Sequence, residues 1–340
     1  MFEEYFVKLL ALVERKSKIT ELFYPIVMIL QRENIARNQD VVFQTLGNED
    51  IIRIPAFDFL KESEWLLKSI NEHEGEFILP YIETFVRNIF THSLKAKSSD
   101  KTDIRIVLHD RRTKINSEMG FSIKSQLGGD STLLNASKAT NFCFKIEGAD
   151  FSDEEIDAIN NLNPKKNKVI ERVNAIRAKG AVLIYDRIDS AMFRNNLVML
   201  DGDLPIIIAN LLLAQLNTGI STLKELVETI TVINPLEYDL SHASPFYEYK
   251  IKHLLTAVAL GMMPAKAWNG RYEANGGYLV VKKDGDILCY HFYDRNRFED
   301  YLYSNAYLER SSTTRHEYAA IVKDTDGTLS FKLNFQVRLK

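Results

Sequence analysis

The segment between residues 103 and 127 contains two runs with strong strand character, and it constrains the fold more than any other part of the chain. DIRIVLHD occupies Asp103–Asp110, and MGFSIKSQL begins at Met119 after a polar loop. Runs rich in Ile, Val, Leu and Phe that flank a short polar segment are typical of a β-hairpin. A hairpin needs further strands or helices to cover its apolar side chains, so we expect it to lie in a central sheet.

Other segments predict a mixture of helices and strands around this hairpin. Apolar residues at helical spacing predict two helices within residues 1–36, one over 80–94, helical structure over 152–177 and two helices between 205 and 232. Short strands are predicted over 142–146 and 181–185. Two Asp-Gly pairs, at 284–285 and 326–327, lie between alternating runs and indicate β-hairpins in the last part of the chain. The pattern favours an α/β protein.

Composition excludes several classes of protein. The 340 residues are 46% hydrophobic and 26% charged, which supplies enough apolar surface for a packed core and excludes a disordered chain. The two cysteines, Cys143 and Cys289, lie far apart and outside any CxxC spacing, which argues against a disulfide framework and a zinc site. A net charge of −3 argues against coating nucleic acid by charge alone, although a specific binder can concentrate its cations on one surface.

The sequence contains no segment that predicts a membrane location. The most apolar run, Leu204–Leu216, is too short to span a bilayer and is interrupted by Asn210 and Gln215. The N-terminus carries Glu3 and Glu4 rather than the basic residues of a secretory leader. We therefore expect a cytoplasmic protein with no membrane partner.

Lys124 lies on the second strand of the predicted hairpin. Period-two alternation puts it on one face of the strand together with Ser122 and Gln126. Asp110 ends the preceding strand, fourteen positions before Lys124. We expect the hairpin connection to bring the Asp110 carboxylate and the Lys124 ammonium to the same rim of the sheet.

A carboxylate beside a lysine is suited to phosphodiester hydrolysis, because the carboxylate holds a hard cation such as Mg²⁺ and the lysine acts on the attacking water. Mg²⁺ prefers more than one carboxylate, yet Ser122 stands where an acid is expected. Our preferred second acid is Glu83, beside the apolar stripe of the helix over 80–94, and the alternatives are Glu118, Asp103 and Asp130. An Asp followed by a strand Lys is also common by chance, since a strand lysine often extends to solvent.

Two groups of polar side chains are candidates for contacts with nucleic acid. Hydroxyl and amide side chains commonly hold phosphate oxygens, and such residues cluster near Lys124: Ser125, Thr132, Asn135, Ser137, Lys138, Thr140 and Asn141. One face of the last predicted strand carries side chains of the types that read base edges, namely Lys332, Asn334, Gln336 and Arg338, and Arg315 begins the preceding hairpin. The same residues also fit caps, turns and a half-exposed sheet.

Three blocks of the sequence strongly resemble the HpaII family of type II restriction endonucleases. They are GFSIKSQLGGDSTLLNASKATNF from Gly120 to Phe142, the segment from YKIKHLLTAVALGMMPAKAWNGRY to FEDYL over 249–302, and the closing RHEYAAIVKDTDGTLSFKLNFQVRL. The resemblance covers most of the chain after about residue 80. It implies the PD-(D/E)xK nuclease fold, a mixed β-sheet flanked by helices, with Mg²⁺-dependent cleavage of both strands of duplex DNA.

The resemblance implies roles for individual residues as well. Asp110 and Lys124 fall where the motif needs its acid and its lysine, and Gln126 is placed to orient the lysine or the water. The sequence departs from the motif in having no Pro before Asp110 and in having Ser122 at the acid position. Some related CCGG-cutting enzymes also carry Ser there and recruit a glutamate from a helix, the part that Glu83 would play.

The implied organisation is an N-terminal helical segment over 1–75, a catalytic nuclease core over 76–240 and a β-hairpin-rich DNA-recognition part over 241–340, packed on the same core. The family's namesake indicates a short palindromic target such as CCGG in double-stranded DNA. A palindrome favours a homodimer that places one active centre on each strand. A cognate DNA methyltransferase is expected in the cell, to protect its chromosome, but not as a binding partner of this chain.

Two rival interpretations remain open at this stage. The first is a sequence-specific DNA-binding protein that has lost catalysis, which Ser122 at the acid position makes conceivable. The second is a structural or protein-interaction domain whose polar strand faces simply meet solvent. If the protein has lost catalysis, replacement of Lys124 by Ala leaves its activity unchanged. If it is a structural or interaction domain, it has no salt-dependent affinity for DNA.

Overall fold

The computed structural model describes residues 21–22, 26–29, 40–45, 50–72, 79–88, 91–93, 102–109, 116–125, 130–164, 167–282, 287–291 and 295–340. The chain forms two compact units, each described here by itself. Unit 1 comprises Met1–Ser131, Ala259–Gly261 and Tyr272–Phe298, and unit 2 comprises Thr132–Val258, Met262–Arg271 and Glu299–Lys340. The division into three segments that was inferred from the sequence stays a prediction.

The first described residues of unit 1 form short strands. β2 (Ile26–Ile29), β3 (Asp40–Thr45) and β4 (Asp50–Pro55) form an antiparallel sheet, and β1 (Glu21–Leu22) pairs with β5 (Thr91–Ser93). The two helices predicted within residues 1–36 are therefore not found at residues 21–22 and 26–29, which form strands. The strand β2 contains β-branched residues that suit a pleated sheet, and its pairing with β3 outweighs the helical spacing of its apolar side chains.

Two helices follow these strands. α2 runs from Ala56 to Glu72, and α3 from Pro80 to Asn88. Pro80 occupies the first position of α3, where its missing N–H removes no helical hydrogen bond. The predicted helix over 80–94 is thus confirmed at its start, although it ends earlier because β5 follows. The Tyr81 hydroxyl donates a 2.9 Å hydrogen bond to the buried Glu62 carboxylate, which joins α3 to α2.

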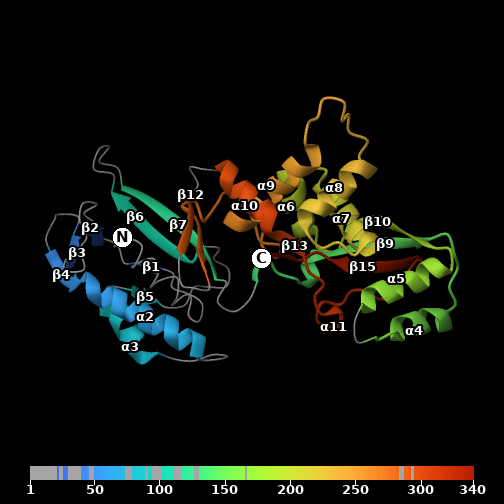
Figure 1. Ribbon diagram of the computed structural model, residues 1–340. Coiled ribbons are helices and arrows are strands. Elements are labelled where there is room, and N and C mark those ends of the chain that lie inside the picture. Colours follow the sequence, from blue (N-terminus) through green and yellow to red (C-terminus); the bar gives the residue numbers. More distant parts are fainter. Residues whose placement is uncertain are drawn as a thin grey trace. The chain divides into compact units, whose positions relative to one another are not determined.

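The predicted hairpin lies in a four-stranded mixed sheet of unit 1 with the order β12-β11-β7-β6 (Figure 1). β6 (Ile104–His109) and β7 (Asn116–Ser125) form the antiparallel hairpin itself. β11 (Gly277–Val281) lies parallel to β7 and antiparallel to β12 (Ile287–His291). The expectation of a mixed sheet is confirmed, because parallel and antiparallel pairs meet in one sheet.

β11 approaches β7 closely at two glycines. The Gly276 N–H donates to the Gly120 carbonyl at 2.7 Å, and the Asn275 Oδ1 accepts a 2.7 Å hydrogen bond from the Gly120 N–H. A Cβ on Gly120 would lie 2.5 Å from the Glu273 carbonyl oxygen, and a Cβ on Gly276 would lie 2.6 Å from the Phe121 ring. Both positions therefore require glycine, and the register between β7 and β11 is fixed at this end.

Unit 2 is built on an antiparallel sheet with the order β10-β9-β15-β14. Its strands are β9 (Asn141–Glu147), β10 (Val182–Ile188), β14 (Ile321–Lys323) and β15 (Leu329–Asn334). Figure 1 shows α4 (Asp153–Asn161) and α5 (Lys168–Ala178) on one side of this sheet, with α7 (Leu204–Thr218) and α8 (Leu223–Ile233) on the other. Phe142 and Phe144 of the central strand β9 are fully buried. These strands and helices confirm the sequence-based elements.

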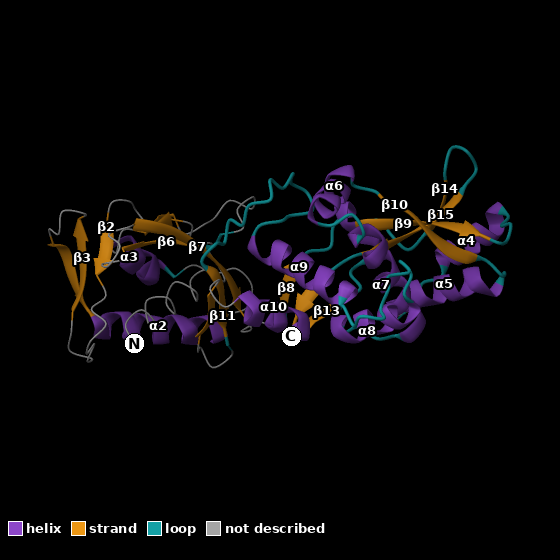
Figure 2. Cartoon of the chain, turned by 90° about the horizontal axis from the view of Figure 1, so that it is seen from above, coloured by secondary structure: helices purple, strands orange, loops and turns teal. Residues whose placement is uncertain are grey.

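Further helices occur in the second half of the chain. Figure 2 shows α6 (Ala191–Leu200), α9 (Phe246–Leu260) and α10 (Arg295–Asn305), and Figure 1 shows the short α11 (Thr313–His316). The part after residue 241 is therefore not built of hairpins alone, although both predicted hairpins, β11–β12 and β14–β15, are confirmed. The turn predicted after α7 is also present, since Gly219 ends that helix with a φ of 74°.

The last predicted strand is broken in two. β15 ends at Asn334, and β16 (Val337–Leu339) belongs to a different sheet, with the order β13-β16-β8, beside β13 (Ala306–Leu308) and β8 (Ser131–Leu134). Between them the Phe335 N–H donates to the Thr140 carbonyl at 2.9 Å. The predicted single polar face over 332–338 is therefore wrong, because period-two alternation does not continue across the break.

No single helix among the described residues is long and apolar enough to cross a membrane. α6 and α7 pass that test only as a pair, by length and composition, and the chain bends by 108° between them.

Candidate active site

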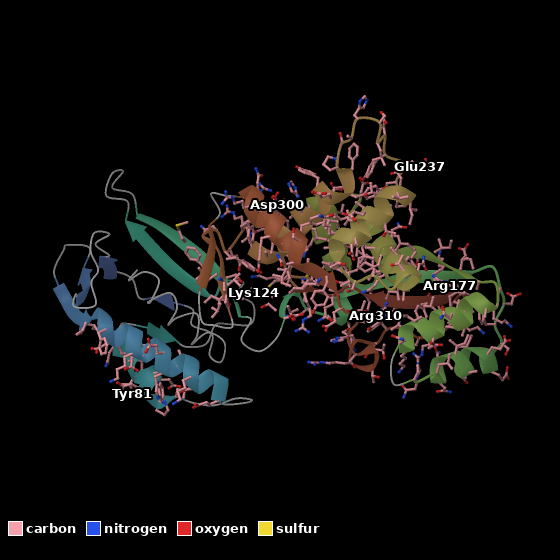
Figure 3. All side chains as sticks on the ribbon, in the orientation of Figure 1. Tyr81, Lys124, Arg177, Glu237, Asp300 and Arg310 are labelled. Atoms are coloured by element: carbon pink, nitrogen blue, oxygen red, sulfur yellow. The ribbon has the colours of Figure 1, made fainter. Side chains whose placement is uncertain are left out.

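Lys124 lies near the end of β7 in the mixed sheet of unit 1 (Figure 3). Its side chain is half-buried, and its Nζ lies 5.7 Å from the centroid of the Tyr278 ring. Ser122, two residues earlier on the strand, is buried and is paired with Tyr278 in the parallel register of β11. Two-residue spacing on a strand puts Ser122 and Lys124 on one face, as the sequence predicts.

Asp103 lies at the same end of the hairpin as Lys124. It immediately precedes β6 and is buried, and its backbone N–H donates to the Phe121 carbonyl at 2.9 Å. Its carboxylate oxygen Oδ2 accepts two hydrogen bonds from β7, one from the Ser122 hydroxyl at 3.1 Å and one from the Ile123 N–H at 2.6 Å. The structure thus joins the Asp103 carboxylate to Ser122 and Ile123, at the end of β7 that carries Lys124.

The hairpin register places the end of β6 away from Lys124, while the role of Asp110 itself stays a prediction. Asp110 and Gln126 themselves lie outside the described residues. His109, the last residue of β6, is paired with Asn116, the first residue of β7. Lys124 lies eight positions beyond Asn116, a span of about 27 Å along an antiparallel strand. The end of β6 and Lys124 are therefore at opposite ends of the hairpin, and the start of β6 is the end that faces Lys124.

Tyr278 is the buried aromatic residue next to this cluster. It is fully buried, and its ring packs at a tilt against Phe298 with a centroid distance of 5.4 Å. Burial raises the pKa of the Tyr278 hydroxyl well above its ordinary value, and the negative charge of Asp103 raises it further. Hydrogen bonding with Ser122 lowers the pKa, but by less than burial raises it. The hydroxyl therefore stays protonated, and the ring presents a neutral face to the Lys124 ammonium.

Glu83, the preferred second acid, is placed on α3. Its carboxylate forms an ion pair with Arg87 of the same helix, with 3.6 Å between Oε2 and the guanidinium nitrogen. In Figure 3 Tyr81, which lies on the same helix, is drawn well apart from Lys124. A role for Glu83 as a metal ligand stays a prediction. Of the other candidates, Asp130 is exposed, and Glu118 lies within β7 opposite Val107.

Asp103 fits one ligand position of a hard cation. Its two hydrogen bonds within the described part of the chain both end on Oδ2, so Oδ1 is the oxygen left for a metal ion. Mg²⁺ is commonly held by one or two carboxylates and keeps several waters. The described residues contain no group of three or more His, Cys, Asp or Glu side chains that would hold a metal ion. Asp103 is thus a candidate for one protein ligand, and a metal site here would need further carboxylates.

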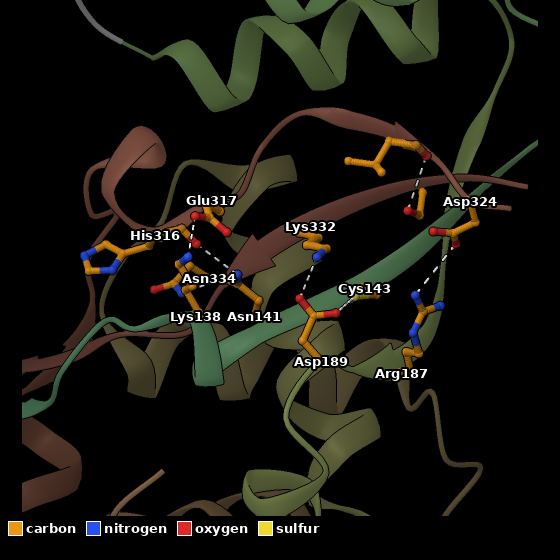
Figure 4. A network of polar contacts seen from close by, with 12 residues as sticks. Lys138, Asn141, Cys143, Arg187, Asp189, His316, Glu317, Asp324, Lys332 and Asn334 are labelled. Carbon is orange, nitrogen blue, oxygen red and sulfur yellow. Dashed lines mark hydrogen bonds and ion pairs between the residues drawn. The ribbon is translucent and has the colours of Figure 1, made fainter. Parts of the chain in front are cut away.

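Several predicted DNA contacts form a buried polar network in unit 2 (Figure 4). Thr140, Asn141 and Asn334 are all buried. The Asn334 amide nitrogen lies 2.8 Å from the Ser137 carbonyl oxygen, 3.1 Å from the Thr140 Oγ1 and 2.7 Å from the Asn141 Oδ1. The Asn141 amide in turn donates to the His316 carbonyl at 3.0 Å. These side chains hold η1 (Lys138–Thr140), β9 and β15 together, and their amides are engaged within the protein.

The remaining predicted contacts differ in exposure. Lys332 forms an ion pair with Asp189 at 2.7 Å, Arg338 forms one with Glu309 at 3.0 Å, and Lys138 forms one with Glu317. Gln336 is buried, Ser137 and Thr132 are half-buried, and Asn135 and Arg315 are exposed. Nothing is described of the Ser125 side chain. Asn135, Lys138 and Arg315 are thus the predicted contacts that are exposed, and a role in DNA binding stays a prediction for the whole set.

Comparison with known proteins identifies the relatives of this chain. The model of the family described as HpaII restriction endonuclease matches residues 7–339. The chain is 42% identical over 324 residues to the type II restriction enzyme HpaII of Haemophilus parainfluenzae, and the match covers 92% of this chain and 88% of that protein. The chain belongs to the HpaII restriction endonuclease family. No solved structure matches it.

Membership of the HpaII family confirms the resemblance carried by the three sequence blocks, and with it the expectation of a restriction endonuclease, a site-specific deoxyribonuclease. It extends that resemblance over nearly the whole chain, including the residues before 80. The fold is confirmed as a mixed α/β architecture with several sheets. The assignment to the PD-(D/E)xK nucleases stays a prediction.

Reasoning from the sequence did not single out two residues of the cluster. Asp103 was considered as a second acid and ranked below Glu83, although in a hairpin the start of one strand faces the end of the next. That rule is the signal that favours Asp103 over Asp110 as the partner of Lys124. Tyr278 has no local signal, because a distant strand brings it beside β7.

Proposed function

We propose that this HpaII-family chain hydrolyses phosphodiester bonds of double-stranded DNA at a short specific sequence in a Mg²⁺-dependent reaction, and that Asp103 and Lys124 are its central catalytic groups. The observation that supports this proposal is the cluster formed by Asp103, Ser122 and Lys124 at one end of the hairpin β6–β7. A carboxylate with one uncommitted oxygen beside a lysine suits metal-assisted hydrolysis.

Each side chain has a separate task in the proposed mechanism. Asp103 would hold the cation, while the Ser122 hydroxyl and the Ile123 N–H fix the orientation of its carboxylate through Oδ2. Lys124 positions or deprotonates the water that attacks phosphorus. Bound Mg²⁺ supplies positive charge that stabilises the transition state at the scissile phosphate. Glu83 and Gln126 retain their predicted roles, the first as a further metal ligand and the second in orienting the lysine or the water.

The relative's name supports a proposal about the target. We infer a short palindrome such as CCGG, because the chain is 42% identical to the type II restriction enzyme HpaII. A palindrome is read most simply by a two-fold dimer, with one active centre for each strand. Cleavage of DNA in the cell requires a cytoplasmic location and a protective methyltransferase that need not bind this chain.

A test uses unmethylated phage DNA incubated with the purified protein in Mg²⁺ or in EDTA. Wild type is compared with Lys124→Ala and with the control Lys145→Ala, which removes a lysine from β9 that is paired with Asp186. We expect discrete fragments in Mg²⁺ from wild type and the control, and none from Lys124→Ala; sequencing of the fragment ends gives the site. Undigested DNA together with tight, specific binding by wild type supports the alternative, a catalytically inactive DNA-binding protein.

A further inference from the structure

Tyr278 lies beside the strand that carries Lys124. It is on β11, and in the parallel register of the mixed sheet it is the partner of Ser122. We propose that Tyr278 is a positioning residue of the nuclease, whose ring holds the Lys124 ammonium in place at the end of the hairpin where Asp103 lies. This inference rests on the proposed function, because it concerns the lysine that the proposal makes catalytic.

The ring of Tyr278 is held between a cation and a second aromatic ring. The Lys124 Nζ lies over the ring at 5.7 Å from its centroid, within the range of a cation–π interaction. The Phe298 ring packs against it with a centroid distance of 5.4 Å and an interplanar angle of 55°. A flexible lysine chain has several rotamers, and attraction to a fixed ring face favours those that keep its ammonium in one place.

The position of Tyr278 is rigid, which a positioning residue requires. β11 is buried along its whole length, from Gly277 to Val281. Next to its start, Gly120 and Gly276 allow the two strands to approach so closely that an added Cβ at either position would clash. The ring therefore has a fixed place relative to β7, and the side chain of Lys124 is the mobile member of the pair.

Unit 2 contains a matched pair that serves as a control. The Lys252 Nζ lies 5.3 Å from the centroid of the Tyr303 ring, and Tyr303 is also buried. Lys252 is held in addition by ion pairs with Glu248 and Asp300. Tyr303→Met thus removes a buried ring from beneath a lysine without touching the Asp103 cluster.

The test compares single-turnover cleavage rates of wild type, Tyr278→Met, Tyr278→Phe and Tyr303→Met, with DNA affinity and folding measured alongside. We expect Tyr278→Met to cleave about tenfold more slowly with unchanged DNA affinity, as for the loss of a partly buried cation–π contact. Tyr278→Phe keeps the ring and should stay within about threefold of wild type. Tyr303→Met should cleave at the wild-type rate.

A series of variants that differ only in the ring at position 278 keeps the inference testable if Tyr278→Met does not fold. Incorporation of increasingly fluorinated phenylalanines at position 278 preserves size while it weakens the attraction for a cation. The cleavage rate should fall with each fluorine, while the melting temperature stays close to that of Tyr278→Phe. If Lys124→Ala is inactive, either of two results overturns the inference. One is an unchanged cleavage rate across the series, and the other is a Tyr278→Phe variant that folds but does not cleave. An active Lys124→Ala instead overturns the proposed function.

Discussion

Asp103 and Ser122 are joined across the hairpin β6–β7 by a 3.1 Å hydrogen bond from the serine hydroxyl to Oδ2 of the carboxylate. The serine stands at the position where the nuclease motif expects an acid, and it is buried. Its hydroxyl does not replace the charge of an acid; together with the Ile123 N–H it orients an acid supplied by the neighbouring strand. This relationship explains how a chain with Ser122 retains one carboxylate at the end of the hairpin that carries Lys124.

Replacement of Ser122 by Asp puts a second carboxylate within hydrogen-bond distance of Asp103. In EDTA we expect Ser122→Asp to lower the free energy of unfolding by about 3 kcal/mol, because two buried like charges repel. Mg²⁺ should restore part of this loss by binding between the carboxylates. Urea denaturation in EDTA and in Mg²⁺ measures both effects. Ser122→Ala, the control, should lose about 1 kcal/mol in either buffer; equal stability of Ser122→Asp in both buffers contradicts a metal site here.

Asn334 is predicted to stabilise unit 2 rather than to read bases. Its buried amide nitrogen has three acceptors around it, on Ser137, Thr140 and Asn141. Asn334→Leu should lower the free energy of unfolding by about 3 kcal/mol, since those acceptors lose their donor. The exposed Asn135→Ala should change it by less than about 0.5 kcal/mol. A stable Asn334→Leu enzyme that cleaves at altered sequences contradicts the structural role.

The Cys143 thiol predicts a loss of stability at alkaline pH. Burial, helped by the hydrogen bond to Asp189, raises the pKa of Cys143 to about 12. In the unfolded chain the thiol ionises near pH 8.5. Between these values the unfolded state binds fewer protons, so stability falls as pH rises, by about 2 kcal/mol between pH 7 and pH 10. The free energies of unfolding of wild type and Cys143→Ser, measured from denaturation curves, should therefore diverge above about pH 8.5. Parallel pH dependences of the two would contradict a destabilising ionisation of Cys143.

Arg172 is predicted to be structural although it lies in a basic segment. It is buried, and its guanidinium donates to the backbone carbonyls of Leu162, at 3.1 Å, and of Asn160 and Ala319. Lysine cannot reproduce this fork of donors, so Arg172→Lys should lower the free energy of unfolding by about 2 kcal/mol. Cleavage by the folded fraction should be unchanged. Arg177→Lys, at an exposed site on the same helix, is the control; equal stability of both variants refutes the assignment.

Local sequence patterns predicted the individual helices and strands better than they predicted which strands pair with one another. Alternation of apolar residues identified β6, β7 and β9, because the residues of one strand carry that signal themselves. Helical spacing of apolar residues predicted a helix over β2, where pairing with β3 decides the structure. The polar alternation from Lys332 to Arg338 was real but misleading, since the strand breaks after Asn334 and the amide turns inward.

The candidate site depends on contacts between distant segments, which one sequence does not reveal. Lys124 and Ser122 were predicted correctly as neighbours on one strand face, because two-residue spacing is a local property. The choice between Asp103 and Asp110 depends on the hairpin register, which only the pairing of both strands determines. Tyr278 reaches the site through the parallel pairing of β11 with β7, between segments far apart in the chain.

The most direct test of the central claim compares Asp103→Asn with Asp110→Asn in single-turnover cleavage of unmethylated DNA in Mg²⁺. We expect Asp103→Asn to bind DNA but to cleave it about a thousandfold more slowly, because it loses the carboxylate beside Lys124. Asp110→Asn should cleave at close to the wild-type rate, since the strand end before it lies at the opposite end of the hairpin. Wild-type cleavage by Asp103→Asn together with an inactive Asp110→Asn contradicts the account.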